Sequence, residues 1–215
     1  MPIREESENG HETAFTFYRP LAGSDKPPGS LPQNFPAPEI LQLVISDLTS
    51  AEIEKSAERL HVSFSELRGL PYIFSVDDFC SYNCIHLLQQ IRVEALEKLP
   101  PALIYISPSK RRHIILPGLS DSNLRSLYVA TQIGHLQLHL PEKTAQNGAV
   151  FLREEVPQKC FEQAALFAMA FLLPKFIIEP IIAEKNRRAA IDGLAVELGI
   201  PTQVIKGRLA QLTPA

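Results

Sequence analysis

Cysteine is scarce in this sequence of 215 residues, which contains only Cys80, Cys84 and Cys160. Three thiols cannot all pair with one another, so packed thiols are expected in place of a disulfide framework. No second pair of cysteines or histidines stands near Cys80 and Cys84 to complete a zinc knuckle. A structural metal is therefore not expected at these cysteines.

Long apolar runs and an excess of basic charge are also missing. No run reaches the roughly 18 uncharged apolar residues of a membrane-spanning helix. The opening residues, MPIREESENGHE, are acidic and contain no apolar signal region, which predicts a cytoplasmic protein. The net charge of −3 gives no general attraction to nucleic acid or to an anionic membrane, so DNA binding would need a local basic patch.

Apolar residues make up 45% of the chain, enough for a sizeable core in one domain with a small appendage. Residues 1–37 are rich in proline, glycine, serine and glutamate, which predicts an extended tail. The predicted divisions after this tail are a helical region over 38–100, a domain over 101–185 and a helical pair over 186–215.

The region 38–100 reads as helical throughout. Apolar spacing predicts helices over 38–48 and 82–99. Capping boxes, formed by Thr49 with Glu52 and by Ser63 with Glu66, predict further helix starts. Residues 56–67, SAERLHVSFSEL, then match the pattern of a helix-turn-helix, with His61 at the turn position where glycine is usual.

The hydrophobic period changes after residue 101. Residues 102–107 (ALIYIS) and 112–117 (RHIILP), joined by the turn-like PSKR, predict an antiparallel hairpin. Helices are expected over 124–140 and 160–173, and two short helices around a glycine-containing turn over 187–212. This order predicts an α+β fold, mostly helical with a small antiparallel β-sheet.

One helical stretch, ATQIGHLQLH over 130–139, is similar to the metal-binding helix of zinc peptidases. The H-E-x-x-H pattern of such helices places two imidazoles on one face, with a glutamate between them as general base. From about residue 102 to residue 212 the chain resembles the ImmA/IrrE family of zinc peptidases. The segments that carry the resemblance are IILPGLSDSNLRSLYVATQIGHLQLH (114–139), EQAALFAMAFLLPK (162–175) and LAVELGIPTQVIKGRLAQL (194–212).

The resemblance implies a zincin-like fold and assigns positions to the metal site. The first metal histidine falls on Thr131, the catalytic glutamate on Gln132, the second histidine on His135 and the acidic ligand on Gln163. A neutral amide is a poor zinc ligand and cannot act as a general base. We therefore expect no catalytic residues, no metal and no cofactor. The predicted function is that of an inactive peptidase-like regulator, which binds a protein such as a repressor-type transcription factor.

The sequence is also compatible with two alternatives. In the first, His135 and His139 bind zinc with Glu162 or Cys160 as third ligand, and the protein is an endopeptidase that cleaves a repressor. Leu136 follows His135, however, so the general base is still missing.

In the second alternative, the peptidase-like part is a scaffold for a DNA-binding transcriptional regulator. Residues 194–205 match a helix-turn-helix pattern, and basic residues that could contact phosphates surround them. These residues are Lys185, Arg187, Arg188, Lys206 and Arg208. The simpler interpretation of such charges is a solvated surface.

Overall fold

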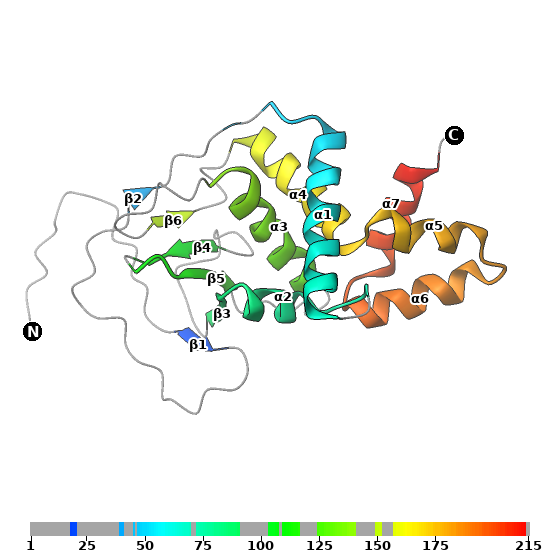
Figure 1. Cartoon of the computed structure of the whole chain (residues 1–215), viewed down its shortest axis with the longest axis horizontal. Coiled ribbons are helices and arrows are strands. Elements are labelled where there is room, and N and C mark those ends of the chain that lie inside the picture. Colours follow the sequence, from blue (N-terminus) through cyan, green and yellow to red (C-terminus); the bar gives the residue numbers. More distant parts are fainter. Residues whose placement is uncertain are drawn as a thin grey trace, which may run out of the picture.

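The computed structural model describes residues 18–20, 39–40, 45, 47–69, 72–90, 103–107, 109–116, 124–140, 149–151 and 157–213. Within them the protein is mostly helical, with one small sheet at the end opposite the C-terminal helices (Figure 1). The helices are α1 (Ser50–Arg68), α2 (Val76–Tyr82), α3 (Arg125–Leu138), α4 (Gln158–Leu172), α5 (Lys175–Ala183), α6 (Arg187–Leu198) and α7 (Thr202–Leu212). The strands are β1 (Tyr18–Pro20), β2 (Glu39–Ile40), β3 (Ile85–Gln90), β4 (Leu103–Ile106), β5 (Arg112–Leu116) and β6 (Ala149–Phe151).

The sheet is mixed, with strand order β1-β3-β5-β4-β6-β2. β4 and β5 pair antiparallel, with Ile104 opposite Ile114. β3 runs parallel to β5, and β2 runs parallel to β6. The expectation of a purely antiparallel sheet is therefore wrong, because it took no account of β3, whose residues were predicted to be helical.

The prediction of a helix over 82–99 is wrong in its described part, because a shorter helix, α2, ends at residue 82 and a strand follows it. α2 stops at Tyr82, and Cys84 has a positive φ of 54°, a conformation that a continuing helix excludes. Residues 85–90 then form β3, and residues 91–99 lie outside the described part. Ile85 and Leu88 fit a helical spacing, but Ile85 is buried in a strand that pairs with β5. Pairing with a distant strand outweighed the local pattern.

The segment 38–48 is also not helical where it is described. Residues 39–40 form β2, and residues 45, 47 and 48 are irregular. The short strand pairs with β6, which lies far along the chain and was absent from the local pattern. β1 falls within the segment predicted as an extended tail, and the rest of residues 1–37 lies outside the described part.

α1 begins as predicted. The Thr49 hydroxyl accepts a hydrogen bond from the Glu52 amide at 3.3 Å, and the Glu52 carboxylate accepts one from the Thr49 amide at 2.8 Å. This capping box satisfies amide groups that have no partner inside the helix. The prediction is confirmed at this end.

The second predicted helix start and the helix-turn-helix over 56–67 are wrong. α1 runs unbroken through both, and it ends at Gly69, whose φ is 59°. Its buried side chains include Ile53, Ala57, His61 and Phe64, which lie on one face at helical spacing. The continuous core-facing stripe explains why no turn forms.

α3 packs against α4, and α1 crosses α4 (Figure 1). The two helices lie very close at Gly134, where a Cβ atom would stand 2.8 Å from the Ala164 carbonyl oxygen and 3.3 Å from the Phe167 Cβ. No real side chain tolerates such contacts with a backbone atom. Glycine at this position therefore fixes how closely the two helices that carry the candidate site can approach.

α5, α6 and α7 pack on one another at the C-terminal end (Figure 1). Gly199 adopts a left-handed conformation with φ 61°, and its turn joins α6 to α7, as the sequence predicted. Among the described residues, no single helix is long and apolar enough to cross a membrane. In the part of the chain that the structure describes, one bent pair, α4 and α5 at an angle of 63°, reaches that length and composition when taken together.

Candidate functional site

The four positions that the resemblance assigns to a zinc site lie where α3 packs on α4. Thr131, Gln132 and His135 are on α3 and Gln163 is on α4, and each is less than 10% exposed. His139 caps the C-terminal end of α3 and is fully buried. The described core-facing part of α3 has no exposed residue from Val129 to Leu136. Thr131, Gln132 and His135 therefore face the interior.

A chain of hydrogen bonds connects three of these side chains. The Nδ1 atoms of His135 and His139 are 3.1 Å apart, and His139 Nε2 is 3.0 Å from Gln163 Oε1. Gln163 Nε2 then donates to the carbonyl oxygen of Leu48, just before α1, at 3.4 Å. We call this chain, His135–His139–Gln163, the polar relay.

The chemistry of the relay fixes its protons. The Leu48 carbonyl can only accept, so the Gln163 amide nitrogen points at it and the amide oxygen points at His139. That oxygen also only accepts, so His139 carries its proton on Nε2. Nδ1 of a neutral His139 is then an acceptor, and His135 must donate to it from its own Nδ1.

Both imidazoles are held neutral. Burial, with a smaller contribution from His139, lowers the pKa of His135 to about 3. Burial also lowers the pKa of His139, although the hydrogen bond to Gln163 opposes this shift. Neutral imidazole is the form that binds metals, but no carboxylate belongs to the relay to balance the charge of a dication.

Thr131 and Gln132 contribute no catalytic group. The Thr131 hydroxyl donates to the Leu127 carbonyl one turn earlier, at 2.9 Å, so its hydrogen serves the helix backbone. The Gln132 Oε1 atom is buried and has no hydrogen-bond partner among the described residues. An amide oxygen does not take up a proton near neutral pH, so this position cannot activate water.

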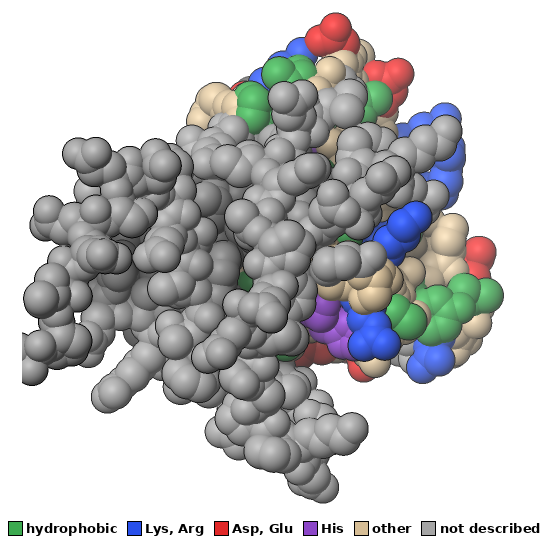
Figure 2. Space-filling model, turned by 90° about the vertical axis from the view of Figure 1, so that its left-hand side faces the viewer, with side chains coloured by type: hydrophobic (Ala, Val, Ile, Leu, Met, Phe, Trp, Pro, Cys, Tyr) green, Lys and Arg blue, Asp and Glu red, His purple; other side chains and the backbone are tan. Residues whose placement is uncertain are grey.

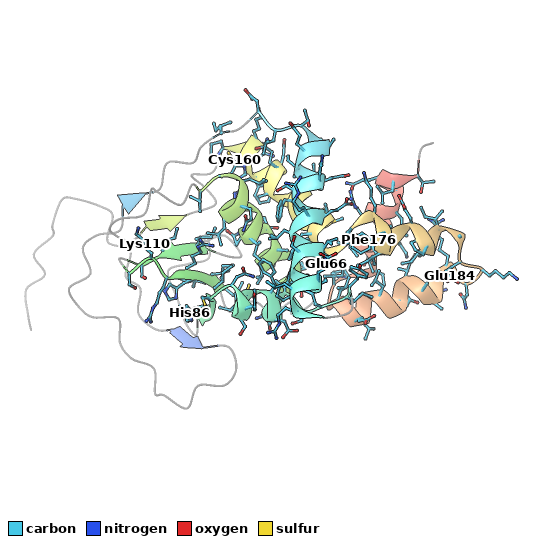
Figure 3. The ribbon with its side chains drawn as sticks, viewed as in Figure 1. Glu66, His86, Lys110, Cys160, Phe176 and Glu184 are labelled. Atoms are coloured by element: carbon cyan, nitrogen blue, oxygen red, sulfur yellow. The ribbon has the colours of Figure 1, made fainter. Side chains whose placement is uncertain are left out.

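The shifted-ligand alternative gains no third ligand from the geometry. Glu162 is exposed and accepts a hydrogen bond from Gln158 at 2.9 Å, one turn back on the same helix. Cys160 is buried near the start of α4 (Figure 3), and burial raises the pKa of its thiol. Within the described part of the chain, no three of the His, Cys, Asp and Glu side chains are grouped to hold a metal ion.

Arg208 was predicted to contact DNA, and this prediction is wrong. Its side chain is fully buried, and its Nη1 lies 2.7 Å from a carboxylate oxygen of Glu54 on α1. Its Nε donates to the Leu173 carbonyl at 3.3 Å. A guanidinium held in this way joins α7 to α1 and to the end of α4, and it cannot reach a phosphate.

The other predicted DNA contacts, Lys206, Arg187 and Arg188, are exposed, as is Lys185. Arg188 lies 3.9 Å from Asp192 on the next turn of α6, a weak surface pair. Figure 2 views the other end of the molecule, where lysine and arginine side chains of the described residues stand in separate groups with acidic side chains nearby.

Two features were not predicted from the sequence. His61, predicted in a turn, is buried in α1, and Glu54 is the partner that keeps Arg208 buried. The sequence did contain a signal that Arg208 is buried. It lies on the same face of α7 as Ile205, Leu209 and Leu212, which pack in or against the core at helical spacing.

A comparison with protein-family models and a search of curated proteins gave no match to this chain.

Proposed function

We propose that this protein is a zincin-like member of the ImmA/IrrE-type group that has lost catalysis and acts by binding a protein in transcriptional control. One observation carries the proposal. The positions assigned to the two histidines and the acidic ligand, Thr131, His135 and Gln163, come from two packed helices and are all buried at their junction. Only one of the three is a residue that zinc prefers.

The residues present do not fit a zinc ion. The oxygen of Gln163 accepts a hydrogen bond from His139, and the hydroxyl of Thr131 donates to a carbonyl of its own helix. A metal at this place would compete with both contacts, and beside the imidazole of His135 it would gain only neutral oxygen ligands, which zinc binds poorly. These residues therefore offer no route to hydrolysis, and a bound protein would leave uncut.

The binding function is tested by affinity capture from the native host. We expect the wild-type protein to retain an intact transcription factor of the repressor type, and to carry no stoichiometric zinc after purification. Gln132→Arg places a long cation where the buried amide oxygen of Gln132 lies, and this change should abolish the capture if the partner binds at the junction of α3 and α4. Gln137→Arg, an exposed position on the same helix, is the matched control.

Recovery of a cleaved partner, or of one zinc per chain, would contradict the proposal. If Gln132→Arg and Gln137→Arg capture the partner equally well, the partner does not bind at Gln132. The melting temperature of each variant must be measured alongside, since the substitution at Gln132 lies in a buried region.

DNA binding is a second candidate, and the α6–α7 pair favours it. A short turn that begins with the left-handed Gly199 joins α6 to α7, as the helix-turn-helix pattern requires. The exposed face of α7 carries Gln203, Lys206 and Ala210 at the helical spacing of a recognition surface. Arg187 and Arg188 at the start of α6 are exposed and would contact the phosphate backbone of the DNA.

If this pair binds a duplex, Lys206→Ala should weaken binding to genomic fragments. Each lost phosphate contact lowers the slope of log affinity against log salt by about 1, because one fewer counterion is released. A titration across salt concentrations measures the slope. The charge-neutral control is Gln203→Ala, which should leave the slope unchanged, and an intact protein that shows no binding at low salt would exclude the candidate.

A further inference from the structure

His61 is the one histidine of α1, and it occupies the core-facing stripe of that helix with only 2% of its surface exposed. Both of its ring nitrogens face backbone carbonyl oxygens. Nδ1 lies 2.7 Å from the oxygen of Phe171, and Nε2 lies 2.6 Å from the oxygen of Tyr72. The side chain thereby links α1 to the end of α4 and to the segment that precedes α2.

Two carbonyl partners set a condition on the ring. A carbonyl oxygen only accepts hydrogen bonds, and a neutral imidazole has one N–H group. The neutral ring can therefore satisfy one carbonyl, while its other nitrogen turns a lone pair toward the second. Both contacts are favourable only when the ring carries two protons, in the imidazolium form.

The surroundings partly suit a cation. The ring centroid is 4.5 Å from that of Phe74 and 5.6 Å from that of Phe176, and aromatic faces attract positive charge. Phe171 is in the last turn of α4, where the helix dipole is negative and carbonyls have no partner within the helix. The amide of Lys175, four residues on, donates instead to Glu58 at 3.0 Å.

The charges around His61 come from several elements. Glu58 lies one turn earlier on α1, and the Lys175 ammonium of α5 and the Arg208 guanidinium of α7 are both held by Glu54. Asp78 of α2 is bonded to Ser75, and the charged residues of α4, Lys159 and Glu162, lie in its first turns, far from Phe171. Burial lowers the pKa of His61 below its ordinary 6.5, while the carbonyls of Phe171 and Tyr72 and the charge of Glu58 oppose that shift.

The two hydrogen bonds of His61 do not break equally easily. The Phe171 oxygen is buried with the core, and losing its donor would leave it unsatisfied. Tyr72 is 51% exposed and belongs to an irregular segment, so its carbonyl can turn to water. When the ring is neutral, the hydrogen bond that breaks is therefore the one to Tyr72.

We propose that His61 is a proton-operated latch, which holds the segment 72–75 on α1 when both ring nitrogens are protonated and releases it when the ring is neutral. The segment carries Tyr72, whose ring packs on Phe176 at 5.1 Å between centroids. Phe176, labelled in Figure 3, lies at the start of α5 beside α1. Release of the latch separates this exposed aromatic pair and changes the surface between α1 and α5.

The sign of the effect follows from linkage. The bond to Tyr72 favours the charged ring, so protonation favours that bond, and the contact tightens as pH falls through the folded-state pKa, which lies below 6.5. The amides of residues 73–75 should therefore be about tenfold better protected from hydrogen exchange in acid, after correction for intrinsic rates, which is the lower end of what a hydrogen bond to a charged group contributes.

The experiment compares amide exchange of the whole protein at about pH 5 and about pH 7.5, which lie on either side of the ordinary histidine pKa of 6.5. His61→Gln keeps one donor but cannot gain a proton, so it should remove the pH dependence. His86→Gln, at an exposed histidine on β3, should retain it. Equal protection of residues 73–75 at both pH values, or the same change in His61→Gln, would overturn the latch.

A second measurement does not depend on a variant that folds. The ring nitrogen shifts of His61 in the wild-type protein, followed by NMR, should show two protonated nitrogens at the pH where the segment 72–75 is protected. They should show one protonated nitrogen where protection is lost. A ring with only one proton in the protected state would refute the proposal.

Discussion

Replacing Arg208 with alanine is expected to lower the free energy of unfolding by about 3 kcal/mol, the scale for removing one member of a buried ion pair. The guanidinium is fully buried, bonds to Glu54 at 2.7 Å and donates to the Leu173 carbonyl at 3.3 Å. Its loss leaves that carbonyl without its donor and leaves Glu54 with Lys175 alone, at 2.8 Å and nearer to solvent. Denaturation by urea, followed by far-ultraviolet circular dichroism, measures the change.

Lys206, two residues earlier on α7, provides the matched control. Its side chain is exposed, so Lys206→Ala should change the free energy of unfolding by no more than about 0.5 kcal/mol. A loss at Arg208 as small as the loss at Lys206 would mean that the pair with Glu54 does not join α7 to α1. Weak DNA binding by the Arg208 variant would report damage to the fold and would say nothing of a phosphate contact.

The same pair gives the protein a sensitivity to acid. Burial raises the pKa of Glu54, but the hydrogen bonds and charges of Arg208 and Lys175 outweigh this and place it below its ordinary 4.5. A carboxyl group with a lowered folded-state pKa contributes stability above pH 4.5 and loses it as pH falls through the folded-state value. The Arg208 variant should therefore lose less stability than the wild type between neutral pH and acid.

Local signals in the sequence predicted the structure where local chemistry decides it. The capping box at Thr49, the hairpin of β4 and β5, and the glycine turn between α6 and α7 each depend on residues close together in the chain. The failures are of another kind. β2 and β3 pair with strands distant in sequence, and His61 was placed in a turn because its own distant partners, Phe171 and Tyr72, were unknown.

The candidate site divides in the same way. The resemblance selected Thr131, Gln132, His135 and Gln163, and the structure buries all four near the junction of α3 and α4. It did not predict that His139 would stand between His135 and Gln163, because a hydrogen bond across two helices depends on how closely they pack. Gly134 permits α3 and α4 to pack closely, but the spacing of residues in the sequence does not reveal the distance between two helices.

The combined change Thr131→His, Gln132→Glu and Gln163→Glu is expected to convert the protein into a zinc-binding one. It supplies a histidine four residues before His135, a carboxylate on α4 and a glutamate as general base, the open arrangement of catalytic zinc. The variant should take up about one equivalent of zinc, whereas the wild type should purify without it. Metal analysis after dialysis measures the ratio of zinc to protein.

The variant carries its own thermodynamic test, since two new carboxylates enter a region where the original side chains are less than 10% exposed. Without metal they should lower the melting temperature, because unpaired buried charges destabilise the fold, and zinc should restore it. Adding His135→Ala to the triple change removes one ligand and should abolish both uptake and rescue. Zinc bound by the wild type and lost on His139→Ala would instead support the shifted ligands. A folded triple variant that binds no zinc would show that these positions do not have zincin geometry, and the proposed relationship to the peptidase family would fail with it.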